Sequence, residues 1–81
     1  MADLLDILRA MADPTRMRIV HLLGAMELSV VELAQAVAQS QPRVSRHVRI
    51  LAEAGLVDRR KEGNCVFLRL GSSPACTRLM D

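Results

Sequence analysis

Eighty-one residues suffice for one domain but not for two, and we expect residues 1–81 to form a single unit in which 71–81 is a short or truncated helix. A hydrophobic fraction of 51% exceeds what one small core can bury and favours a second copy, while two cysteines, Cys65 and Cys76, are too few for a disulfide scaffold. The first 40 residues hold three basic against five acidic side chains and the remainder eight against four, so the rear half suits a polyanion.

Two helices are predicted in the first third of the chain. From Asp3 to Met11, apolar side chains recur on one helical stripe, formed by Leu4, Leu5, Leu8 and Met11. Asp13 and Pro14 then suit an N-cap and a first turn, and a second helix is expected from Pro14 to about Leu23, ended by Gly24. Its buried stripe should consist of Met17, Val20 and Leu23, widened by Ile19 and Leu22.

A helix-turn-helix is predicted next. Ser29 and Glu32 have the S-x-x-E spacing of a capping box, which opens a short helix to about Val37 with an inward face of Leu33, Ala34 and Val37. Ser40 is expected to cap a following helix, from Gln41 to Ala54, whose core stripe is Val44, Val48 and Leu51. Gly55 should end that helix. Only residues 38–40 separate the two helices, which is the spacing of a helix-turn-helix.

A β-hairpin is predicted after Gly55, because the apolar period changes from 3.6 to about 2. We expect strands at Leu56–Lys61 and Cys65–Leu70, joined by a tight turn at 62–64. A hairpin that directly follows a helix-turn-helix is a wing. The predicted fold class is therefore mainly α with a small β-hairpin, a winged helix-turn-helix of order α-α-α-α-β-β with a short C-terminal helix at about 75–80.

The helix that starts at Gln41 carries side chains suited to reading double-stranded DNA. Arginine, glutamine and serine can hydrogen-bond to base edges, and the first turns of a recognition helix usually meet them, so we predict major-groove contacts from Gln41, Arg43, Ser45 and Arg46. Arg49 lies a turn later and should meet a phosphate, and Ser40 and His47 belong to the same predicted surface. The alternative is that these arginines form only the solvated face of an amphipathic helix.

The predicted hairpin carries a second cationic group. Arg59, Arg60 and Lys61, with Asn64 in the turn, suit the phosphate backbone or the minor groove. Because side chains alternate along a strand, Arg60 should point opposite to Arg59 and Lys61. The alternative reading is that these charges protect an edge strand from aggregation.

Other polar residues are given structural interpretations. His47 lies beside the core stripe, and we expect a half-buried ring that donates one hydrogen bond to backbone or phosphate rather than a metal ligand. Arg16 is expected to pair near the start of its helix, with a phosphate contact as the alternative. Cys65 and Cys76 are expected to be buried or incidental thiols, with a redox or thiophilic-metal site as the alternative.

Catalysis, cofactors and membranes receive no support from the sequence. No Ser/His/Asp set, carboxylate pair or phosphate-cradling glycine loop is recognisable, so we expect no enzyme, no cofactor and no metal site. A signal peptide and a membrane-spanning stretch are likewise not recognisable, which makes a cytoplasmic protein the expectation.

Four segments resemble ArsR/SmtB-type winged-helix regulators: residues 11–20 are similar to LADPTRLRIL, 27–34 to ELSVGELA, and 40–48 with 51–57 to SQPxVSRHLxxLxEAGLV. The resemblance implies a homodimer that binds a palindromic DNA operator and represses nearby genes. It also implies an interface made by the first and last helices, with the residues Leu4, Leu5, Leu8, Met11, Leu79 and Met80.

The chain departs from this family at two places. Members that sense arsenic, cadmium or lead carry cysteines where this chain has Ser29 and Val31, so that metal site is absent. Ala38 stands where relatives often have glycine, and a positive φ there would cost alanine roughly 1 kcal/mol. Residues 4–16 and 39–47 also resemble the regulator part of proteins fused to S-adenosylmethionine-dependent methyltransferases. Two functions are alternatives to a DNA-binding repressor: a regulatory domain of such an enzyme, and a thiol sensor that uses Cys65 and Cys76.

Overall fold

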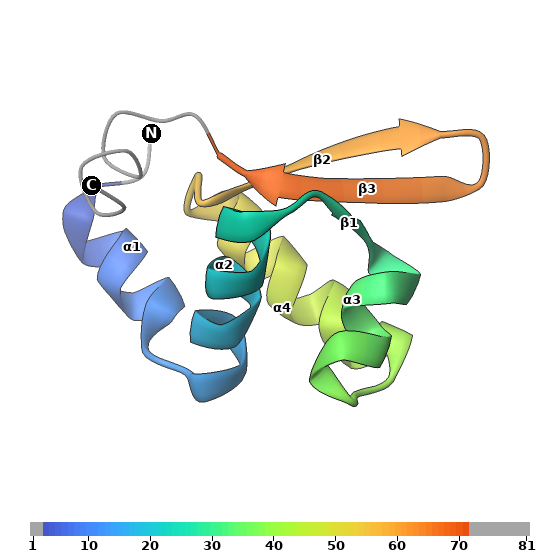
Figure 1. The fold of residues 1–81 in the computed structure, drawn as a ribbon. Helices are drawn as coiled ribbons and strands as arrows, with labels where there is room; N and C mark the ends of the chain where they lie inside the picture. Colours follow the sequence, from blue (N-terminus) through green and yellow to red (C-terminus); the bar gives the residue numbers. More distant parts are fainter. Residues whose placement is uncertain (1–2, 72–81) are drawn as a thin grey trace.

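A computed structural model describes residues 3–71, and the predicted C-terminal helix, with Cys76, Leu79 and Met80, lies outside these residues. The elements in chain order are α1 (Leu4–Met11), α2 (Pro14–Ala25), β1 (Leu28–Ser29), α3 (Val30–Val37), α4 (Gln41–Glu53), β2 (Val57–Glu62) and β3 (Cys65–Leu70). The β2–β3 hairpin projects beyond the helices on the side opposite α1 (Figure 1). The mainly helical winged helix-turn-helix predicted from the sequence is confirmed.

Side-chain caps set where the helices begin. The Asp13 carboxylate accepts the backbone N–H of Arg16 at 3.0 Å, with Pro14 in the first turn of α2. Ser29 and Glu32 form the complete capping box of α3, with reciprocal bonds of 3.1 and 2.9 Å. Ser40 caps α4 as predicted. The predicted end of α2 at Gly24 is wrong, because the helix continues to Ala25.

One core joins all four helices to the sheet. Its fully buried side chains include Ile7, Ile19, Leu33, Val44, Val48, Leu51, Leu56 and Leu68. The prediction that Met17 is buried is wrong: this side chain is 54% exposed, because α2 turns Ile19, Val20 and Leu23 inward. In α1 the buried positions are Ile7 and Ala10, so the predicted leucine stripe lies outside the core.

The sheet has three antiparallel strands in the order β1-β3-β2, one more than predicted. Leu28 and Ser29 of β1 pair with Leu68 and Phe67 of β3. Strand β2 starts at Val57, one residue later than predicted, after Gly55 has ended the helical segment with a φ of 78°. The short β1 ties the entrance of α3 to the wing, which fixes the hairpin relative to the helices.

Two features characterise the turn between α3 and α4: a strained backbone conformation at one residue and a long-range hydrogen bond made by the next. Ala38 has φ 55° and ψ 43°, so the positive φ anticipated at this position is present. The next side chain, Gln39, donates a hydrogen bond of 2.9 Å to the hydroxyl of Thr15 in the first turn of α2. A contact with α2, which is not part of the helix-turn-helix, therefore stabilises the turn that positions α4.

Candidate nucleic-acid interface

Helix α4 has one buried apolar face and one exposed polar face. Val44, Val48 and Leu51 are buried, which orients the helix against the core. The polar positions assigned to DNA reading are all exposed: Ser40, Gln41, Arg43, Ser45, Arg46 and Arg49. Arg49 has an ion pair with Glu53 at 3.5 Å, but both side chains are at least 70% exposed, so this pair is weak and readily exchanged for a phosphate.

The helix and the wing strand together form a cationic groove, lined by Pro42, Ser45, Arg46, Arg49 and Arg59. Four of these residues come from α4, and Arg59 comes from β2. Arg59 pairs in register with Leu68, whose side chain is buried, so its strand face is the one that looks toward the helices. The structure thus brings three predicted arginines from two elements to one concave surface, which we call the arginine groove.

A second hollow lies between the start of α4 and the tip of the wing. Its lining combines polar side chains and a thiol with three valines: Ser29, Gln41, Ser45, Asn64, Cys65, Val30, Val31 and Val66. Asn64 was predicted as a DNA contact only because of its place in the turn. In the structure it lies near the start of α4. The thiol of Cys65 is free and exposed, not buried.

Arg60 is placed differently from the other predicted contacts. Its guanidinium lies 2.8 Å from a carboxylate oxygen of Glu27 and 2.9 Å from one of Glu62. It also lies 5.3 Å from the centre of the Phe67 ring. The expected alternation is observed, but two carboxylates neutralise this cation. Sequence reasoning missed Glu27, because no local pattern links it to a strand 33 residues later.

His47 is half-buried as expected, but its partner is a side chain. Nη1 of Arg16 lies 3.4 Å from Nδ1 of His47, and Nε of Arg16 donates to the carbonyl of Ala10. The expectation that Arg16 pairs near its helix start holds only for its backbone N–H, which Asp13 accepts. That bond, followed by attraction to the positive charge of Arg16, lowers the pKa of the Asp13 carboxyl.

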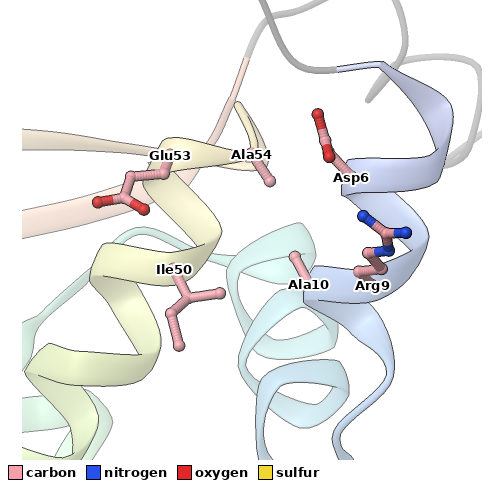
Figure 2. Close-up of a pocket in the computed structure, with 6 residues that line it drawn as sticks. All are labelled: Asp6, Arg9, Ala10, Ile50, Glu53 and Ala54. Atoms are coloured by element: carbon pink, nitrogen blue, oxygen red, sulfur yellow. The ribbon is translucent and has the colours of Figure 1, made fainter.

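A further hollow lies between α1 and the end of α4, lined by Asp6, Arg9, Ala10, Ile50, Glu53 and Ala54 (Figure 2). Its charges have opposite signs, and the carboxylate of Glu53 points away from α1, so it offers neither an acid–base pair nor an anion site. Among residues 3–71, no three His, Cys, Asp or Glu side chains gather as metal ligands. No helix in this part of the chain is long and apolar enough to span a membrane.

Comparison with known proteins agrees with this geometry. Residues 11–60 match the model of a family described as a helix-turn-helix domain. The arsenical resistance operon repressor of Escherichia coli strain K12 is 45% identical over 67 residues, which are 82% of this chain and 57% of the repressor. The regulator KmtR of Mycobacterium tuberculosis is 40% identical over 65 residues, or 80% of this chain and 50% of that protein. The chain thus spans little more than half the length of these relatives.

Solved structures agree as well. HlyU of Vibrio cholerae N16961 matches with a TM-score of 0.84 at 37% identity, covering 94% of this chain and 83% of that one. A homodimeric winged helix-turn-helix DNA-binding domain from Mycobacterium bovis, described as a possible ArsR-family regulator, matches with a TM-score of 0.82 at 28% identity, covering 93% and 68%. The relationship therefore includes the wing as well as the helices.

Proposed function

Since the chain belongs to the ArsR/SmtB-type winged helix-turn-helix regulators, we propose that it binds double-stranded DNA sequence-specifically as a homodimer and represses transcription. The proposed target is a palindromic operator, because a two-fold symmetric protein reads two equivalent half-sites. We also propose that the protein acts in the cytoplasm. We propose residues 1–81 as one DNA-binding unit, with no catalytic step of its own.

The arginine groove is the observation that supports this proposal most strongly. A major groove about 12 Å wide admits an α-helix, and α4 presents its polar side outward because its apolar side is locked into the core. The candidates for base edges are then Gln41, Arg43, Ser45 and Arg46. Arg49 and Arg59, on the two sides of the groove, are the candidates for phosphates.

Dimer formation is supported by the outer face of α1. Leu4, Leu5 and Leu8 are 56%, 53% and 51% exposed in the single chain, and together they form an apolar stripe on a surface helix. Met11 lies at the end of this stripe and is half-buried. We propose that this stripe packs against a second copy, which also provides the burial that a small core lacks.

Selection of bound duplexes from a random pool tests the function directly. We expect enrichment of an inverted repeat whose half-sites lie about one helical turn, or roughly 10 base pairs, apart. Arg46→Ala should then weaken binding to the selected operator by about 1–3 kcal/mol and relax the preference at one base pair. Arg9→Ala removes the same charge from α1, outside the arginine groove, and is the matched control. Enrichment of no sequence, or equal losses in both variants, would contradict the proposal.

A further inference from the structure

Arg16 is the side chain at which three helices meet. It lies in the first turn of α2, and its guanidinium contacts both the last turn of α1 and the half-buried His47 on α4. The proposed function assigns no role to it. Its contacts nevertheless run from the helix with the exposed leucine stripe to the helix with the polar reading face.

The sequence explains why Arg16 reaches Ala10. The last carbonyls of a helix have no partner within it, and the residue four positions after Ala10 is Pro14, which has no N–H to donate. Nε of Arg16 supplies the missing donor. The backbone of Arg16 is itself fixed, because its N–H is bound by the capping carboxylate of Asp13 at 3.0 Å.

The chemistry of Arg16 also selects the tautomer of the neutral His47 ring. A guanidinium has five N–H donors and no acceptor, so Nδ1 of His47 must accept, and the ring proton is then on Nε2. Because the guanidinium is planar and rigid, two bonds made from one guanidinium fix their two partners relative to each other. The carbonyl of α1 and the ring on α4 are thus held at a set separation.

We propose that Arg16 is a positioning residue for the recognition helix, holding α4 at a fixed place relative to α1 through His47. Its effect on DNA rests on the proposed function, whereas the link itself does not. Arg46 is the neighbour of His47 in sequence, and Arg43 precedes it by one helical turn, so a displacement of His47 displaces the reading residues. In a dimer joined through α1, the same link sets how the two recognition helices face the two half-sites.

The tautomer of His47 tests the link without DNA. In the full chain, ¹⁵N NMR at a pH where titration shows the ring to be neutral should report a protonated Nε2 and an unprotonated Nδ1. Because a free neutral histidine side chain also favours a proton on Nε2, Arg16→Met should relax the ratio to that of a free side chain, with a measurable Nδ1–H fraction, while the helical content stays unchanged. A proton on Nδ1 in the parent protein, or an identical tautomer ratio in both proteins, would overturn the proposal whether or not the chain binds DNA.

Substitutions at His47 separate positioning from direct contact. The side-chain oxygen of asparagine can stand in for Nδ1, whereas the amide of glutamine can stand in only for Nε2. We expect His47→Gln and Arg16→Met each to weaken operator binding about 3- to 10-fold, as for one ordinary hydrogen bond, and the double variant to lose no more than either. His47→Asn should retain more operator affinity than His47→Gln. Additive losses, or the opposite order for Asn and Gln, would overturn the proposal.

The salt dependence of binding tests a simpler role for Arg16, direct contact with a phosphate. If Arg16 bound a phosphate, its loss would reduce the slope of log affinity against log salt by about 1, whereas a positioning residue leaves the slope unchanged. Arg16→Lys keeps the charge but cannot span both partners, so it should behave like Arg16→Met. Because Lys is a milder change, it also serves if Arg16→Met does not fold. A parental affinity in Arg16→Lys, or a reduced slope in Arg16→Met, would show that charge alone matters.

Discussion

The Arg60 guanidinium lies against the ring of Phe67, its register partner on β3, at 5.3 Å from the ring centre. Glu27, just before β1, forms an ion pair with the same guanidinium at 2.8 Å. The outer strand of the wing is thereby fastened to the segment that leads into the helix-turn-helix. Arg59, the preceding residue, belongs to the arginine groove. Two adjacent arginines of one strand thus have different environments, and different consequences follow for each.

Arg59→Ala and Arg60→Ala should separate DNA contact from wing stability. We expect Arg59→Ala to weaken binding to all duplexes and to reduce the salt slope by about 1, because one phosphate contact is lost. Arg60→Ala should leave that slope unchanged and lower the free energy of unfolding by about 1 kcal/mol, the usual range for exposed ion pairs with a cation–π contact. Glu27→Gln should reproduce part of the stability loss, because Glu62 and Phe67 still contact Arg60. Chemical denaturation and salt-dependent titrations measure both; a reduced slope in Arg60→Ala would contradict this division.

Ala38→Gly should stabilise the fold by about 1 kcal/mol. Alanine at φ 55° and ψ 43° is strained, and relief of this strain outweighs the extra conformational freedom that glycine gives the unfolded chain. Ala36→Gly is the matched control, because Ala36 is exposed in the regular part of α3, where glycine should cost about 1 kcal/mol. Urea denaturation of both variants measures the two opposite changes. A loss of stability in Ala38→Gly would show that the turn tolerates alanine without strain.

The helices could be predicted because their signals are local. Asp13, Ser29 and Ser40 each cap the helix that they were expected to cap, since a cap needs only a side chain within three residues of a free N–H. The positive φ of Ala38 came from a different source, since only the family resemblance, with glycine common at this position, suggested it. In the candidate site, the exposed face of α4 followed directly from its buried stripe, because the two faces of one helix are complementary.

What the sequence did not predict depends on contacts between distant segments. Strand β1 is only two residues long, too short to show an alternating apolar pattern. Ser29 is both its last residue and the cap of α3, so the sequence indicates only the helix start. The exposure of Met17 was missed because a wide apolar stripe fits more than one helix rotation, whereas Ile19, expected at the edge of that stripe, is fully buried. The contact of Arg16 with His47 joins residues 31 positions apart and leaves no periodic trace.

Asp13 should make part of the stability depend on acid pH. Its carboxyl has a pKa below the ordinary value of 3.8, chiefly because the carboxylate accepts the N–H of Arg16. A group whose pKa is lower in the folded state stabilises that state above its unfolded pKa, so this contribution is complete above about 3.8 and is lost as the pH falls through the folded pKa.

Asp13→Asn isolates this contribution. Asparagine caps a helix about as well as aspartate, so the stability of the variant near neutral pH should stay close to that of the parent while its decline below about 3.8 becomes shallower. Asp13→Ala should instead lose about 1 kcal/mol at neutral pH, because the cap itself is removed. Thermal unfolding from pH 2 to pH 7 measures both curves. Parallel curves for Asp13→Asn and the parent would contradict a folded-state pKa below the ordinary value.

Leu8→Glu should separate dimerisation from folding. Leu8 is 51% exposed in the single chain, so a carboxylate there meets water in the monomer but apolar surface in a dimer joined through α1. We expect sedimentation equilibrium to show a folded monomer, and operator affinity to fall steeply because each half-site is then bound alone. Val31→Glu, at a side chain 48% exposed on α3, is the control and should leave the oligomeric state unchanged. Ile7→Ala, one residue away but fully buried, should instead destabilise the fold by about 2–4 kcal/mol. A dimer of unaltered strength in Leu8→Glu would mean that the leucine stripe of α1 faces something other than a second copy.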